Sequence, residues 1–375
     1  INLLASAAGT LPGASGVEAT LPAREQRAPG AHHYSVSFEQ RFGQDTVFSA
    51  AYVGTQARDL VRFSTPNLGT NAVSLLRSLG NELRGEFRFQ PTFFGIAVAP
   101  GTRLTPLRGD NPVGGQAGGF SGGRPVPGIG GVQFFETSAS SRYDALQLEL
   151  RGRLRSRLQY RAGYTLSKAT DDVSDVFDLA GATALPQNSL TFEGERGPAN
   201  FVARHRFVYH AVYEFPGFDQ RALRALFGGL QIATTGQFQT GQPFTVNSIF
   251  DINLDGNLTD RLDTTDGIVE TGDRRQPLRL STNDLASLRA PVGQDGRVGR
   301  NTFRAGSFLD LNLAFIKNIR LDESRSIVFR MEVFNFINRA NFGIPVRFLE
   351  APGFGQATST LTPGRRVQFH LKYSF

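Results

Sequence analysis

Nine segments of the chain alternate apolar and polar residues, and this pattern constrains the fold more than any other feature. In the last one, the odd positions from Val367 to Phe375 are apolar and the even positions from Arg366 to Ser374 are polar. Successive side chains of a β-strand point to opposite faces, so the pattern predicts strands with one apolar and one polar face. The segments are 34–42, 46–54, 143–154, 157–167, 204–215, 230–239, 308–316, 325–335 and 365–375.

The connections between these segments alternate in length. Short connections are expected at 43–45, 155–156, 216–226 and 319–324, and long ones at 56–142, 168–203, 240–305 and 337–364. Short turns on one side and long loops on the other are typical of a transmembrane β-barrel, with the long loops extracellular. Long loops without structure of their own argue against a compact soluble domain. The sequence therefore predicts an all-β, antiparallel transmembrane β-barrel, with a secreted β-sandwich of enzymatic or lectin type as an alternative.

The composition agrees with a barrel and excludes several other classes of protein. The chain has no Cys, which excludes disulfides and thiol chemistry, and no apolar run is long enough for a transmembrane helix. Its net charge is +7, and only Lys168, Lys317 and Lys372 among the 40 basic residues are Lys. No recognition helix, zinc finger or aromatic–basic platform accompanies the positive charge, so we expect no nucleic-acid partner.

The number of strands predicts an incomplete barrel. Nine is odd, whereas a barrel whose two ends lie in the periplasm needs an even number of strands. We expect residues 1–30 to be a loop or an incomplete upstream segment, and residues 31–375 to be the C-terminal part of an outer-membrane β-barrel.

Several stretches resemble one family of proteins. "YDALQLELRGRLRSRLQYRAGYTLSKATDD", "FRMEVFNFINRANFGIP" and "FGQATSTLTPGRRVQFHLKYSF" are similar to the C-terminal barrel of TonB-dependent receptors, and most similar to the Oar-like group. The resemblance implies a barrel of about twenty-two strands in the cell outer membrane. It also implies energised uptake of an unknown large solute, and contact with the TonB complex through an N-terminal plug. A structural or adhesion protein whose long loops bind surface polymers or neighbouring cells is the alternative function.

The resemblance also gives the C-terminal strand a role. In such barrels an aromatic C-terminal strand resembles the signal that the barrel-assembly machinery reads, which here assigns Tyr373 and Phe375 to that signal. Outer-membrane lipid and the assembly machinery are thus the expected partners.

One loop has the composition of a cation site. In "DINLDGNLTD" the oxygen-bearing residues surround Gly256, as at the start of a Ca²⁺ loop, and hard oxygen ligands suit a hard cation. An Asx-rich turn is the competing interpretation, because Leu262 stands where the closing acid is expected. The candidate Ca²⁺ ligands are Asp251, Asn253, Asp255, Asn257 and Asp260.

A second candidate site is the polar face of the strands. Its charged residues are expected to line the lumen, either contacting a plug or a solute as a group or pairing across strands. They are Arg151, Arg153, Arg161, Arg206, Arg330, Glu149 and Glu332. No catalytic constellation is found: Ser121 in "GFSGG" lacks the strand and helix that a nucleophile elbow requires, so we expect no enzyme activity.

Overall fold

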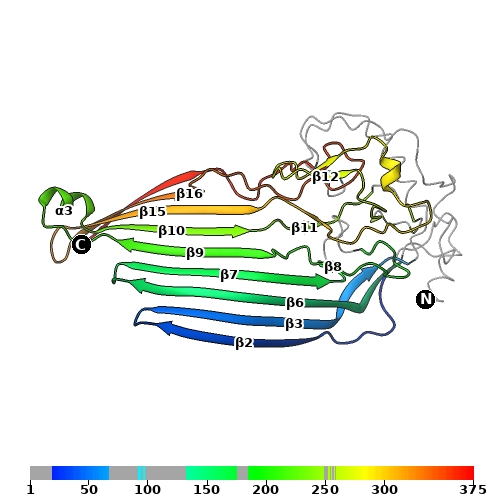
Figure 1. The fold of residues 1–375 in the computed structure, drawn as a ribbon, viewed down its shortest axis with the longest axis horizontal. Helices are drawn as coiled ribbons and strands as arrows, with labels where there is room; N and C mark the ends of the chain where they lie inside the picture. The colour runs from blue at the N-terminus through cyan, green and yellow to red at the C-terminus, as the bar shows by residue number, and fades with distance from the viewer. Residues whose placement is uncertain are drawn as a thin grey trace.

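A computed structural model describes most of the chain, and its largest feature is one curved antiparallel sheet (Figure 1). The described residues are 19–66, 92–93, 96–97, 132–174, 185–248, 252–253, 255, 257 and 259–375. No helix among them is long and apolar enough to span a membrane.

Nine strands follow one another through this sheet, each hydrogen-bonded to the next, in the order β17-β16-β15-β10-β9-β7-β6-β3-β2. All nine predicted segments are confirmed as strands. They are β2 Gly30–Phe42, β3 Thr46–Ser64, β6 Val132–Leu154, β7 Leu158–Asp171, β9 His205–Glu214, β10 Leu230–Gln239, β15 Phe308–Arg320, β16 Ser326–Phe334 and β17 Arg366–Ser374.

The remaining elements are short. The helix α3 (Arg221–Phe227) fills the predicted short connection 216–226, and the 3₁₀ helix η1 spans Leu285–Leu288. The other strands are β1 Ala19–Pro22, β4 Thr92–Phe93, β5 Ile96–Ala97, β8 Gly197–Pro198, β11 Pro243–Phe244, β12 Ile268–Glu270, β13 Leu278–Leu280 and β14 Phe303–Arg304. Of these, β1 joins the large sheet by parallel pairing with β6, and β8 joins it by antiparallel pairing with β7.

Several strands are longer than the sequence pattern indicates, and β3 and β6 are longer by the largest margin. β3 continues to Ser64 and β6 begins at Val132, so part of the predicted loop 56–142 is strand. The register between them shifts twice beyond Ala57, and Asp59 there has a φ of 57°. Such bulges add residues to one strand and break the two-residue period, which is why the pattern ends early.

One face of the sheet is covered with large apolar side chains that nothing in the described structure buries. On the edge strands, Val36 is 74 % exposed and Leu371 75 % exposed, and in the interior strands Leu150 and Phe329 are each 40 % exposed. A continuous apolar surface of this kind is unfavourable in water and favourable in lipid. We call it the apolar face, and the opposite side the polar face.

The described parts of three long connections form a compact structure, which corrects the expectation that they lack structure of their own. Residues 185–204, 240–248, 252–253, 255, 257, 259–305 and 337–364, named here the outer cap, lie at the end of the sheet opposite α3 and the C-terminus (Figure 1). Their hydrophobic core contains Phe244, Val246, Leu262, Leu278, Leu288, Phe303, Leu349 and Phe354.

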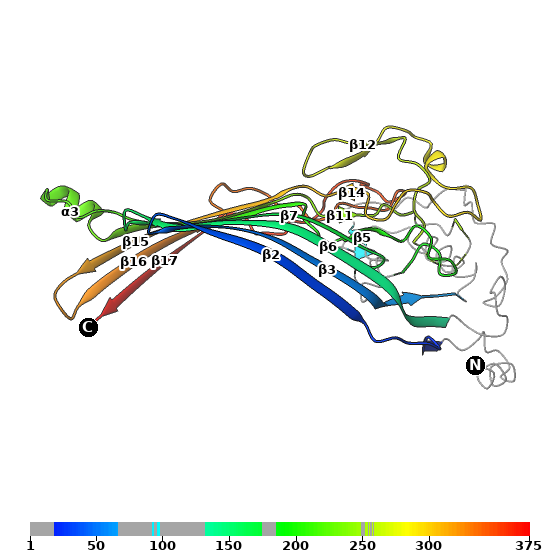
Figure 2. The same cartoon turned by 60° about the horizontal axis from the view of Figure 1, so that its bottom comes forward.

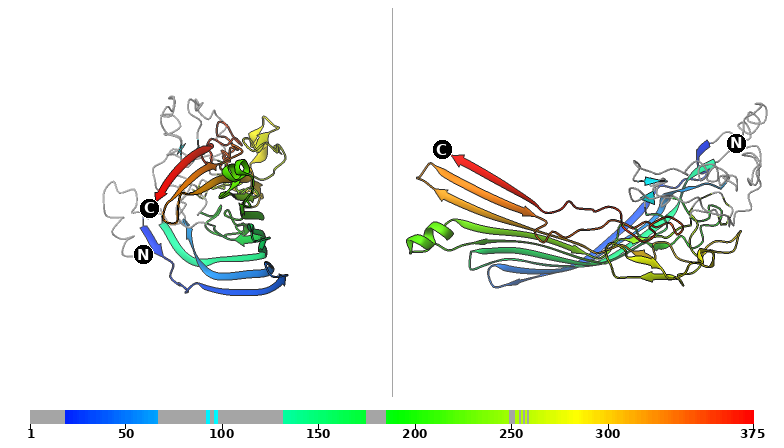
Figure 3. Two further views of the ribbon diagram at one scale, coloured as in Figure 1. Left: turned by 90° about the vertical axis from the view of Figure 1, so that its left-hand side faces the viewer. Right: turned by 90° about the horizontal axis from the view of Figure 1, so that it is seen from above.

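The sheet is curved but not closed in the described residues. Figures 2 and 3 show it bending along and across the strands, with β2 and β17 as its two edges. Every residue of β2 is exposed, as are those of β17 except Ser374. An open sheet with two unpaired edges agrees with a portion of a barrel.

Candidate functional site: the polar face and the outer cap

The first part of the candidate site is an ion-pair group on β2, β6 and β7. Arg151 and Arg161 lie directly opposite each other, a pairing that is destabilising for like charges alone. Glu149 relieves it, because its carboxylate lies 2.6 Å from Arg161 and 3.6 Å from Arg151. Glu39 adds a second acid 3.4 Å from Arg151. The charges on this part of the polar face are therefore largely balanced.

A second ion-pair group lies on β16 and β17. Arg330 donates to Glu332 at 2.5 Å, and His370, directly opposite Arg330, lies 3.6 Å from the same carboxylate. These side chains are about half exposed, apart from the more buried Glu332, and pairs of this kind contribute about 0–1 kcal/mol each. They shape the electrostatics of the face more than its stability.

The seven predicted lumen residues all lie on the polar face, but they do not form one continuous wall. Five of them fall into the two ion-pair groups, which β9, β10 and β15 separate. Within the described residues Arg153 and Arg206 have no ion pair, and they lie toward opposite ends of the strands. Pairing across strands therefore accounts for most of the predicted set.

The structure describes four of the five predicted Ca²⁺ ligands, and these four lie in the outer cap. The Asp260 carboxylate accepts the backbone N–H of Ile252 at 3.0 Å and of Asn253 at 3.4 Å. The Asp255 carboxylate accepts the backbone N–H and side-chain amide of Asn257 at 2.8 and 2.9 Å. Asp251 lies outside the described residues.

This geometry resembles an Asx-rich turn. The carboxylate oxygens face N–H donors, and no group of three acidic or His side chains able to hold a metal occurs among the described residues. As arranged, these side chains do not form a Ca²⁺ cage, so the site stays a prediction. Burial is the main influence on Asp255 and raises the pKa of its carboxyl.

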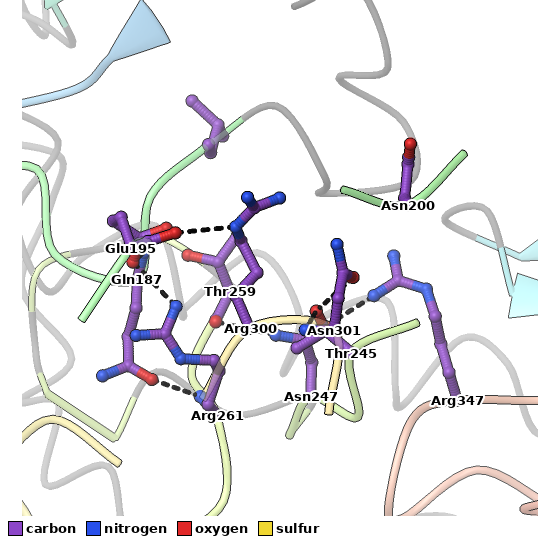
Figure 4. Close-up of a pocket in the computed structure, with 11 residues that line it drawn as sticks. Gln187, Glu195, Asn200, Thr245, Asn247, Thr259, Arg261, Arg300, Asn301 and Arg347 are labelled. Carbon is purple, nitrogen blue, oxygen red and sulfur yellow. Dashed lines mark hydrogen bonds and ion pairs between the residues drawn. The ribbon is translucent and has the colours of Figure 1, made fainter. Parts of the chain in front are cut away.

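A buried group of arginines in the outer cap was not predicted. Arg261 donates to Glu195 at 2.7 Å, and both side chains are almost fully buried (Figure 4). The Gln187 side-chain oxygen accepts the backbone N–H of Arg261 at 2.7 Å, and the backbone N–H of Gln187 donates to the Glu195 carboxylate at 3.0 Å. These partners are 66 and 74 residues from Arg261, so no local pattern in the sequence could reveal them.

Arg300, in the same group, links the outer cap to the sheet. Its guanidinium donates to the Asp171 carboxylate at the end of β7, to the Ser174 hydroxyl at 2.9 Å and to the Glu195 carbonyl at 2.8 Å. The cavity beside Arg261 and Arg300 measures about 20 Å³, space for roughly one water molecule. This buried group therefore stabilises the outer cap and has no room for a solute.

The two residues predicted as an assembly signal end the last strand. The rings of Tyr373 and Phe375 stack with centroids 5.6 Å apart, and Tyr373 pairs with Ile327 of β16. Phe375 is 92 % exposed. Both side chains are thus accessible on an edge strand, and the assembly role stays a prediction. Ser121 lies outside the described residues.

Comparison with known structures gives distant likenesses to outer-membrane transporters and receptors. The Escherichia coli outer membrane transporter YddB is 10 % identical with a TM-score of 0.45, over 96 % of this chain and 34 % of that one. The pyoverdine receptor FpvA of Pseudomonas aeruginosa is 11 % identical with a TM-score of 0.40, over 92 % and 29 % of the two chains. The ferric-catecholate import receptor Fiu of E. coli is 10 % identical with a TM-score of 0.39, over 93 % and 28 %. The chain spans about a third of these proteins or less.

Family membership rests on a match to a family model. The model, described as an outer membrane beta barrel domain, matches residues 2–368, nearly the whole length. A search of individual curated proteins found no match. The structure agrees with the family match, because it is a large antiparallel sheet with one exposed apolar face. The chain therefore belongs to the outer membrane beta-barrel domain family, and its place is the outer membrane.

Proposed function

We propose that this chain is the C-terminal barrel portion of a TonB-dependent receptor of the Oar-like group. The observation that carries the proposal is the combination of a lipid-suited apolar face, an ion-paired polar face and a folded outer cap at the end with the long loops. A plain pore needs no elaborate cap, whereas a receptor presents a shaped surface to its ligand. The distant structural neighbours, an outer membrane transporter and a pyoverdine receptor, agree with this proposal.

In this account the polar face surrounds a plug that the upstream part of the protein supplies. The mixed charges of Glu149, Arg151 and Arg161 offer partners of both signs to a plug surface. Uptake of a solute too large for porins then follows when the energised TonB complex displaces the plug. The chain's own residues do no covalent chemistry.

A labelling experiment in cells separates receptor from adhesin. Because the chain has no Cys, Gln237→Cys places a single thiol on the polar face of β10, and Ser281→Cys places one in the outer cap as a control. We expect a water-soluble maleimide to label position 237 faster in energised cells than in cells treated with a protonophore. Position 281 should be insensitive to the treatment. Equal labelling of position 237 in both states would favour an adhesion or structural role.

A further inference from the structure

A groove of about 460 Å³ lies where the middle of the sheet meets the outer cap. Tyr52, Leu146 and Leu166 line it and belong to the apolar face, since they are in register across β3, β6 and β7. Arg204 and Arg304 line it from the outer-cap side. The groove is thus bounded by lipid-suited side chains on one side and by cations on the other.

The charged side chains that line this groove, Lys168, Arg204, Arg304 and Asp144, carry a net positive charge. Lys168, Arg204 and Arg304 are exposed, and none of them is in an ion pair within the described residues. Among the residues that the structure describes, Asp144 is the only acid that lines the groove. Its carboxylate already accepts from Arg142 at 2.8 Å and from the Tyr52 hydroxyl at 2.6 Å. The Arg304 guanidinium also donates to the Gly241 carbonyl at 3.3 Å. Lys168, Arg204 and the other N–H groups of Arg304 therefore remain available to an anion.

The boundary between apolar and charged side chains is sharp. Leu146 pairs with Leu166, and two residues further toward the cap Asp144 pairs with Lys168. Two residues of a strand span about 7 Å, so the surface changes from apolar to cationic within that distance. The hydroxyls of Tyr34 and Tyr52 meet at Asp144 on this boundary, where tyrosines are favoured at a membrane–water interface. A molecule that fills the groove therefore needs an apolar part and an anionic part that are also about 7 Å apart.

We propose that this groove binds a phosphorylated glycolipid of the outer leaflet, with its acyl chains along Leu146 and Leu166 and its phosphate beside Lys168, Arg204 and Arg304. Phosphate is a strong, multiply charged acceptor that Arg and Lys recognise well. The outer leaflet follows from the usual orientation, in which the long loops are extracellular. A zwitterionic lipid would leave the three cations uncompensated, and a soluble anion would make no use of the apolar floor.

The test uses the full-length protein in detergent with diphosphorylated lipid A as the probe, and measures binding by native mass spectrometry. The variant K168Q/R204Q/R304Q should bind at least tenfold more weakly than wild type. The control R157Q/R221Q/R320Q removes three exposed cations at the opposite end of the sheet and should bind like wild type.

Two comparisons distinguish a lipid site from an anion site. Leu166→Ser should weaken lipid A binding while leaving any binding of inorganic phosphate unchanged, and dephosphorylated lipid A should bind poorly to wild type. The proposal is overturned if both triple variants lose affinity equally, or if wild type binds the dephosphorylated lipid as well as the phosphorylated one. Inorganic phosphate binding as tightly as lipid A would also overturn it. None of these outcomes depends on the protein being a transporter.

Discussion

Arg300 and Asp171 are the residues on which the attachment of the outer cap to the sheet most depends. Both side chains are more than nine-tenths buried. Removal of one partner leaves an unpaired buried charge, so we expect Asp171→Ala to cost about 3–5 kcal/mol of stability. The measurement is urea-induced exposure of the outer cap to protease in detergent. Asp263→Ala is the control, because its partner Arg297 is 78 % exposed and should contribute little. Equal losses in the two variants would contradict the assignment.

The Tyr209 ring packs so closely against Gly236 that it leaves no room for a side chain there. A Cβ at Gly236 would lie 2.2 Å from the Tyr209 ring and 2.8 Å from a Leu311 methyl, so one of them must move. We expect Gly236→Ala to lower the stability of the barrel wall by about 1–3 kcal/mol, as overpacking does. A Cβ at Gly163 would lie 3.6 Å from the nearest side-chain atom, which is ordinary contact. We therefore expect Gly163→Ala to leave the stability unchanged or to raise it by about 0.5–1 kcal/mol. Urea unfolding of the sheet in detergent compares the two, and the opposite ranking would disprove the packing argument.

We expect Asp255 to make the stability of the outer cap depend on pH. Burial raises the pKa of its carboxyl above the ordinary value of 3.8, so the ionised form is the one that folding penalises. That penalty is present at neutral pH and is relieved as the pH falls through the raised pKa, because the folded state then takes up the proton first. We expect Asp255→Asn to be more stable than wild type at neutral pH, with the difference shrinking on acidification.

Protease accessibility of the outer cap across that pH range is the measurement. A constant difference between wild type and Asp255→Asn would show that Asp255 does not titrate in this window. The same pair of proteins also tests the predicted Ca²⁺ site. Calcium should stabilise the wild-type cap and not the variant if the loop binds the ion, and should change neither if the loop is an Asx-rich turn.

At the scale of elements, Lys317 holds helix α3 against the sheet. Its ammonium donates to the carbonyls of Ala225, Leu226 and Gly228 at 2.8, 3.1 and 2.7 Å, which are free acceptors at the end of a helix. A cation here also interacts favourably with the helix dipole. We expect Lys317→Met to loosen α3 and to speed tryptic cleavage after Arg221 and Arg224 several-fold. Lys372→Met, on the polar face of β17, is the matched control, and equal cleavage of both variants would contradict the capping role.

The strands were predictable from sequence because their signal is local. Alternation placed 230–239 with the bounds that β10 has, and placed 365–375 within one residue of β17 at each end. Alternation did not predict the part of β3 beyond Ala57, because bulges there shift the register and interrupt the two-residue alternation of side chains. The core of the outer cap could not be predicted, because Phe244, Leu278 and Leu349 meet across about a hundred residues of chain without a shared pattern.

The candidate sites divide in the same way. Side-chain parity groups the charged residues on one face of the sheet, whereas their separation into two ion-pair groups depends on the register between strands, and their role in the lumen stays a prediction. The composition of 251–260 predicts a cation loop, and that stays a prediction; the direction of the Asp255 carboxylate depends on nearby N–H donors, among them the backbone N–H of Ser189. Buried partners such as Arg300 and Asp171, 129 residues apart, leave no trace in a single sequence.

At the scale of the whole molecule, the central claim is that the apolar face contacts lipid and the polar face contacts water. Strand β15 tests it well, because Leu309, Leu311 and Leu313 alternate with Asp310 and Asn312 in an interior strand. The chain has no Cys, so a single thiol can be placed at each position from 309 to 315 in turn.

The most direct measurement is the accessibility of each of these thiols in lipid vesicles, read with a bimane label and two quenchers. A lipid-phase nitroxide should quench the odd positions and aqueous iodide the even ones, with a period of two residues along the strand. Quenching without this period, or with iodide favouring the odd positions, would contradict the barrel account.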